Sequence, residues 1–300
     1  MKRFFILLTT VLFLMSGFAF AEEAVLIDFS KLAADYPQDN PTQNVRTMVD
    51  YSDKAGTSYS EQEKAQMKAS IALDNWDIIL APSSRTVVNQ SLSLTKEVPV
   101  LDEAKKYAGE TVLGARIHFP EADFNSWALI APPFEIPAYM KKTVLEADGT
   151  LSVDTTDRYG EKFVDGYGVV KNIGVLKSVS VNMYGSNFPN AFEIILKDQN
   201  NKEIPIFMDY MDFEGWRTLT WKNPNYISLV RNREIKTRPL YPKATPMMKI
   251  AGLRVRRDSQ QDGGDIITYI KDISVVYDKA LLSIERDVDE EAIWGILKER

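Results

Sequence analysis

Hydrophobic and polar residues alternate in many short runs along this chain, a pattern typical of half-buried β-strands. In the run 111–119, four apolar side chains fall on one face, while Gly114, Arg116 and His118 fall on the other. Further runs of this kind predict strands at 25–29, 76–80, 85–94, 176–184, 192–197, 204–208, 216–221, 249–256 and 266–277. Short strands spaced by roughly 8 to 15 residues predict a mainly β fold, an antiparallel sandwich.

Helical signals are few. Ser60 followed by Glu63 fits a capping box and predicts a short helix near 60–72. A second box starting at Asp287 predicts a C-terminal helix at about 287–299, whose apolar stripe would dock on its own sandwich or on a neighbouring subunit. The proline-punctuated segment 131–137 reads as an edge strand or extended connection, and Asp148-Gly149 as a turn, with a hairpin as one reading. Strands and helices do not alternate, which argues against a doubly wound fold.

The N-terminus has the three parts of a secretory signal. Lys2 and Arg3 precede an apolar run at 4–15, and Ala19-Phe20-Ala21 offers small residues where a signal peptidase reads. The apolar run is too short for a stable membrane span. We therefore expect residues 1–21 to be removed, leaving 22–300 as a single exported sandwich domain. With no cysteine in the chain, that domain depends on a packed core rather than on disulfides.

Charge is unevenly distributed along the sequence. The formal net charge is −6, and it becomes −8 without Lys2 and Arg3, which argues against a nucleic-acid-binding protein. The segment 222–257, however, has ten Lys or Arg residues and one acid, a net +9. These side chains either scatter over the surface or form a patch for an acidic partner or a neighbouring copy. The residues predicted to form that patch are Arg231, Arg233, Lys236, Arg238, Arg254, Arg256 and Arg257.

Signatures of catalysis are absent from the sequence. His118 is the single histidine, no Gly-x-Ser-x-Gly elbow occurs, and one histidine without cysteine does not suit zinc. The loop 258–265 offers oxygen ligands for calcium but reads equally well as a hairpin turn. Asp209, Asp212 and Glu214 lie in a turn where solvated acids are usual. We expect no catalytic residue, no metal and no cofactor.

Three aromatic residues are candidates for stacking against a sugar: Tyr210, Trp216 and Trp221. The five-residue separation of the two tryptophans places them on opposite faces of one strand, so at least one of them is expected in the core.

Several motifs together resemble the spirochete family of periplasmic flagellar filament outer-layer, or sheath, proteins. The motifs are Val25–Phe29, Asp74–Trp76, Leu113–Pro120, Pro132–Pro137, Asn172–Val181, Gly185–Pro189 and Phe213–Arg217 followed by Trp221. The resemblance covers the mature chain. It implies a non-enzymatic structural protein of the periplasm that coats the flagellin core of the filament and alters its stiffness, its shape and cell motility. The implied partners are flagellin subunits, other sheath proteins and copies of the same chain.

The later strands are also similar to galactose-binding and carbohydrate-module jelly rolls, some of which bind sugars. This similarity predicts a jelly-roll form of the sandwich. It keeps one alternative function open, that of a periplasmic carbohydrate-binding module without catalysis.

Overall fold

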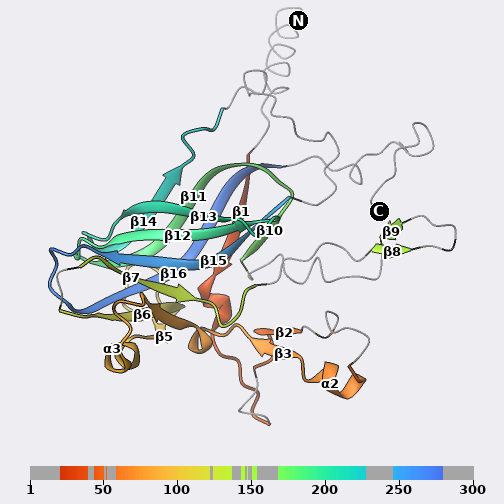
Figure 1. Cartoon of the computed structure of the whole chain (residues 1–300), viewed down its shortest axis with the longest axis horizontal. Coiled ribbons are helices and arrows are strands. Elements are labelled where there is room, and N and C mark those ends of the chain that lie inside the picture. The colour runs from red at the N-terminus through yellow and green to blue at the C-terminus, as the bar shows by residue number, and fades with distance from the viewer. Residues whose placement is uncertain are drawn as a thin grey trace, which may run out of the picture.

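The computed structural model describes residues 21–39, 44–50, 52, 59–121, 124–136, 143–145, 147, 151–153, 168–227 and 246–279. Within these ranges the chain forms a β-sandwich of two six-stranded sheets (Figure 1). The elements are β1 (Glu22–Asp28), η1 (Phe29–Leu32), β2 (Met48–Asp50), α2 (Glu61–Ala65), β3 (Lys68–Ser70), η3 (Leu73–Asn75), β4 (Asp77–Leu80), α3 (Val87–Leu92), β5 (Leu94–Pro99), β6 (Thr111–Phe119), β7 (Ser126–Ala131), β8 (Thr143–Leu145), β9 (Leu151–Val153), β10 (Val169–Lys171), β11 (Ile173–Ser186), β12 (Ala191–Asp198), β13 (Glu203–Tyr210), β14 (Glu214–Lys222), β15 (Met247–Arg257) and β16 (Gly264–Lys279).

The two sheets are antiparallel throughout. Sheet I has the order β14-β11-β16-β6-β5, and β1 also pairs with β16. Sheet II has the order β13-β12-β15-β7-β4, and β10 also pairs with β15. Two small two-stranded sheets, β2 with β3 and β8 with β9, complete the described part. None of the helices in the described ranges is long and apolar enough to cross a membrane.

The core lies between the inner faces of the sheets, where alternate residues of each strand point. On β6 the predicted alternation is confirmed, with Leu113, Ala115, Ile117 and Phe119 at most 1% exposed. Leu253 and Val255 on β15 are fully buried. One large apolar cluster joins both sheets. Burial of these side chains stabilises the sandwich in a chain that has no disulfides.

The two terminal strands of the β13-β12-β15-β7-β4 path in sheet II carry features that hinder further strand pairing. On β4, the side-chain amide of Gln90 donates to the Ile78 carbonyl and accepts from the Leu80 N–H at 3.5 Å. On β13, Pro205 has no N–H to offer. These are two established ways of protecting an edge strand.

Two local predictions require correction, and one strand of sheet II was not predicted. The run 85–94 is not a strand: it contains α3, because the Thr86 side chain accepts from the Asn89 N–H and caps a helix. The helix predicted near 60–72 has its capping box but ends at Ala65, since Lys68–Ser70 pairs with β2. Strand β7, which the sequence reading missed, lies within sheet II.

The hairpin reading is confirmed by the pairing of β8 with β9, whereas Asp148 and Gly149 lie outside the described residues. The predicted signal at 1–21, apart from residue 21, and the C-terminal helix at 287–299 lie there too.

Candidate interaction surface

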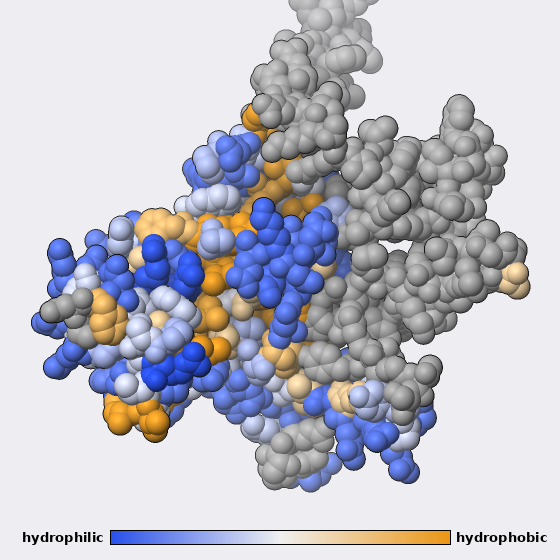
Figure 2. All heavy atoms as spheres, viewed as in Figure 1, coloured by the Kyte–Doolittle hydropathy of each residue, from blue (hydrophilic) through white to orange (hydrophobic). Residues whose placement is uncertain are grey.

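Three of the seven predicted basic-patch residues lie in the described part of the chain, all on β15. The other four, Arg231, Arg233, Lys236 and Arg238, lie outside it. Arg254 and Arg256 point away from the core, as the alternation with Leu253 and Val255 predicts. They lie on the outer face of sheet II, which we call the sheet II face (Figure 2).

A single carboxylate holds both exposed arginines. Glu193 on β12 is 5% exposed. Arg254 Nε donates to Glu193 Oε2 at 2.6 Å, and Arg256 Nη2 lies 2.9 Å from Glu193 Oε1. Two guanidinium groups against one carboxylate leave this trio with one net positive charge. A buried carboxylate requires such partners, because an unpaired charge in this position would be costly.

Arg257 is not part of an exposed patch, because its side chain turns into the protein. Arg257 is 2% exposed, and its guanidinium donates to the backbone carbonyls of Pro120 and Phe124, the latter at 2.7 Å. It also lies 5.8 Å from the ring centroids of Phe119 and Phe124. Arg257 therefore ties β15 to the loop between β6 and β7, and its role is structural.

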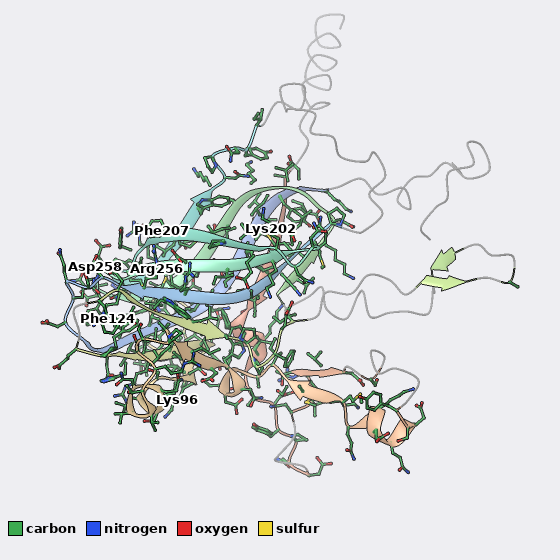
Figure 3. The ribbon with its side chains drawn as sticks, in the orientation of Figure 1. Lys96, Phe124, Lys202, Phe207, Arg256 and Asp258 are labelled. Atoms are coloured by element: carbon green, nitrogen blue, oxygen red, sulfur yellow. The ribbon has the colours of Figure 1, made fainter. Side chains whose placement is uncertain are left out.

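Exposed aromatic side chains lie beside the arginines. Phe207 and Tyr210 on β13 are 42% and 51% exposed, and their rings meet edge to face at 5.4 Å. Tyr210 is in register with Ala191, which is in register with Arg256, and Trp127 of β7 follows on the other side. Figure 3 labels Phe207 and Arg256 on this same face. The fold thus brings Tyr210 together with the basic residues, two predictions that were separate in the sequence.

An apolar band crosses the middle of the sheet II face, visible in orange in Figure 2. Ile195 of β12 is opposite Pro205 of β13 and Gly252 of β15. A Cβ at Gly252 would lie 2.8 Å from the Leu129 side chain, so Leu129 occupies the space over that glycine. Ile79 of β4 pairs with Leu129. The band ends beside α3 at a groove of about 820 Å³ lined by Ile79, Thr86, Val87 and Gln90 among others.

A second set of ion pairs borders the band at the other end of the strands. Lys249 Nζ and Lys197 Nζ both approach the carboxylate of Glu135, the latter at 3.4 Å. The hydrogen bond from Lys249 holds the pKa of Glu135 below its ordinary value, and Lys197 contributes to the same effect. The sheet II face therefore has an apolar centre with charged residues on both sides of it, an arrangement that is common in protein interfaces.

The two candidate tryptophans lie on opposite sides of sheet I, as their spacing predicts. Trp221 pairs with Val179 and packs against the core. Trp216 pairs with Tyr184 on the outer face of sheet I. Trp216 and Tyr210 therefore belong to different faces of the sandwich and form no common site.

The residues considered for catalysis or for calcium binding are engaged in ion pairs and turns. His118 Nδ1 lies 2.7 Å from Asp265 Oδ1, and Arg116 Nη2 donates to Asp265 Oδ2 at 2.6 Å. Asp258 accepts from the Gln260 N–H within its turn, and Asp209 lies 3.8 Å from Arg217. Among the described residues, no three acidic or histidine side chains are grouped so as to hold a metal ion.

Sequence reasoning missed Glu193, Phe207 and the apolar band. Glu193 lies in a run of six buried residues on β12, so its polarity in an otherwise apolar strand was an available signal. Its partners lie 61 and 63 positions away, and only the strand order brings them together.

Comparison with known proteins agrees with the resemblance found in the sequence. Residues 40–286 match the model of the family described as flagellar filament outer layer protein FlaA. A flagellar filament outer layer protein of Spirochaeta aurantia is 48% identical over 300 residues, covering 100% of this chain and 86% of the relative. One of Treponema pallidum is 43% identical, covering 98% and 86%, and one of Borreliella burgdorferi is 32% identical, covering 97% and 82%.

Among solved structures the similarities are distant. A structure from work on carbohydrate-binding modules of the β-sandwich superfamily is 12% identical with a TM-score of 0.32, covering 68% of this chain and 57% of that one. A module in complex with β-1,4-galactotriose is 13% identical with a TM-score of 0.29, covering 67% and 88%. Neither similarity bears on function. The family match and the full-length relatives are decisive, and this chain belongs to the flagellar filament outer layer protein family.

Proposed function

We propose that this protein is exported to the periplasm, loses residues 1–21, and assembles as a non-enzymatic sheath subunit on the flagellin core of the periplasmic flagellum. In this role it modulates filament stiffness, filament shape and motility. The observation that carries the proposal is membership of the filament outer layer family over most of the chain. A layer subunit needs surfaces that bind neighbours, and the sheet II face has the composition that such binding requires.

On this proposal the sheet II face is the docking surface, with flagellin, another sheath protein or a copy of this chain as its partner. Phe207 and Tyr210 are the exposed aromatic anchors, a residue type enriched where interfaces gain most of their affinity. Arg254 and Arg256 carry the net positive charge that would attract an acidic partner surface.

Co-sedimentation of the purified mature protein with isolated flagellin core filaments, over a series of salt concentrations, tests the proposal. We expect saturable binding that weakens as salt rises, because charge attraction is screened. Saturable binding that is indifferent to salt would move the interface to the apolar band alone. Absence of binding to intact filaments by folded protein would overturn direct coating of flagellin.

Substitutions test whether the sheet II face is the surface that binds the filament. Phe207→Ser and Tyr210→Ser remove the aromatic anchors, and Arg256→Gln removes a half-exposed charge while Arg254 still holds Glu193. The structure argues against charge reversal at Arg254, because it would leave Glu193 facing a like charge. Lys96→Gln, on β5 of the other sheet, is the matched control (Figure 3). Weaker binding for the three variants and unchanged binding for the control supports the sheet II face; equal effects reject it.

A further inference from the structure

The outer face of sheet I carries a row of aromatic side chains that the docking surface does not use. Trp216, Tyr184 and Tyr269 are in register on β14, β11 and β16. Their rings meet edge to face, with centroids 5.5 Å apart for the first pair and 5.8 Å for the second. Tyr107, from the loop between β5 and β6, adds a fourth ring 4.9 Å from Trp216. All four side chains are partly exposed.

The loop that supplies Tyr107 is held in an unfavourable conformation. Tyr107 has φ +60°, a left-handed backbone that bulky residues rarely adopt. Lys106 Nζ also reaches the Trp216 carbonyl at 3.5 Å. Such conformations persist where the surrounding structure enforces them, and they concentrate at binding sites.

Polar groups line the next row of the same face. Asn182 Nδ2 donates to Asp272 Oδ1 at 2.6 Å, and the Thr218 hydroxyl donates to Asn182 Oδ1. This fixes the orientation of the Asn182 amide and aims the Asp272 carboxylate. In the described ranges Asp272 Oδ2 forms no hydrogen bond, and neither do the hydroxyls of Tyr107, Tyr184 and Tyr269.

A bulge in β16 places Lys271 beside Asp272 and fixes it there. The register of β16 against β11 shifts at this point. Lys271 Nζ lies 2.8 Å from Asp28 Oδ1 and 2.9 Å from Glu110 Oε2, so its charge is already satisfied. Burial raises the pKa of the Asp272 carboxyl and outweighs the lowering by the Asn182 hydrogen bond and by the Lys271 charge.

We propose that this aromatic row and Asp272 form a carbohydrate-binding site that takes a pyranose ring. Aromatic side chains offer apolar surface to the C–H face of a sugar, while the Asp272 oxygen and the tyrosine hydroxyls supply hydrogen-bonding groups for its hydroxyls. A row built only to cover the sheet would need neither a carboxylate nor three free hydroxyls. The sugar is a glycan on a filament subunit or a free saccharide of the surroundings, and both present the same chemistry.

Isothermal titration of the mature protein with β-linked glucose, galactose and N-acetylglucosamine trisaccharides tests the site. We expect saturable binding of at least one trisaccharide, reduced at least tenfold by Trp216→Ala and by Asp272→Asn. Tyr184→Phe and Tyr269→Phe keep the rings, protect the fold and should weaken binding by a smaller factor. Tyr59→Ala, at an exposed aromatic residue that lies in neither of the two main sheets, is the control and should bind as the parent does.

The outcomes separate this site from the sheath role. Absence of binding by any trisaccharide, or binding lost in Tyr59→Ala and kept in Trp216→Ala, would overturn the site whether or not the protein coats filaments. Binding to trisaccharides, combined with filament association that Trp216→Ala weakens only before enzymatic removal of filament glycans, identifies the filament as the source of the sugar. Trisaccharide binding with filament association unaffected by Trp216→Ala identifies a free saccharide.

Discussion

Arg254 and Glu193 face each other across β15 and β12, with Arg254 Nε 2.6 Å from Glu193 Oε2, although 61 positions separate them in the chain. Their ion pair belongs to the fold as much as to the surface, because Glu193 has almost no access to water. Arg256 shares the same carboxylate but is half-exposed. Although both arginines lie on β15, Arg254 mainly stabilises the fold, whereas Arg256 mainly contributes charge to the surface.

The two arginines should differ in their effect on stability. Arg254→Gln removes the guanidinium that lies closest to a buried carboxylate and should cost about 1–3 kcal/mol. Arg256→Gln removes a largely solvated partner and should cost less than about 1 kcal/mol. Urea unfolding of both variants measures the free energies. Equal losses would mean that Glu193 depends no more on Arg254 than on Arg256.

Substitution by alanine should destabilise the protein at each of two paired glycines, but for a different physical reason at each position. Gly185 and Gly215 are in register on β11 and β14. A Cβ at Gly185 would clash with the Phe213 carbonyl oxygen, so Gly185→Ala should cost about 1–3 kcal/mol by overpacking. Gly215 has φ +83° and open space around it, so Gly215→Ala should cost about 1–2 kcal/mol through backbone strain.

Asparagine distinguishes the two mechanisms, since it tolerates a left-handed backbone better than alanine. In thermal unfolding, Gly215→Asn should melt above Gly215→Ala, while Gly185→Asn should melt below Gly185→Ala. The same order at both positions would show that one mechanism governs both.

Removal of the Lys271 charge should destabilise sheet I. Lys271→Met leaves the carboxylates of Asp28 and Glu110 without their shared cation and should cost about 3 kcal/mol. Burial alone would lower the pKa of Lys271, but hydrogen bonds to Asp28 and Glu110 outweigh it and raise that pKa. The stabilisation is therefore present at neutral pH and lost as the pH rises through the raised pKa.

A second variant checks this explanation. Adding Asp28→Asn to Lys271→Met should recover part of the loss, because one uncompensated charge is removed. Further destabilisation of the double variant in denaturant titrations would refute the electrostatic account.

The acid side of the stability profile should depend on Asp265. Hydrogen bonds from Arg116, and then from His118, hold the pKa of Asp265 below its ordinary value. An acid with a depressed folded-state pKa contributes stability above its unfolded value, about 3.9 for Asp, and this contribution is lost as the pH falls through the folded-state pKa. Melting temperatures measured downward from pH 5 should fall less steeply for Asp265→Asn than for the parent. Parallel curves would contradict this.

Much of the fold could be predicted from the sequence, because a β-strand produces a local alternation of apolar and polar residues. The alternation in β6 and the outward direction of Arg254 and Arg256 follow from a period of two residues. The helix α3 was misread because its two valines favour strands, while the deciding contact is the Thr86 cap. The order of the strands could not be predicted from the sequence. The contacts of Arg254 with Glu193, and of Trp216 and Tyr269 with Tyr184, depend on that order and could not be predicted either.

The protected outer strands β4 and β13 of sheet II limit how copies of this protein can join. Gln90 occupies the hydrogen-bonding groups of β4 that a further strand would use, and Pro205 interrupts the row of donors along β13. Crowded copies are therefore hindered from pairing edge to edge through β4 or β13, a route that would be hard to reverse. Copies can still associate through contacts between side chains. The affinity and selectivity of such contacts can be changed by single substitutions.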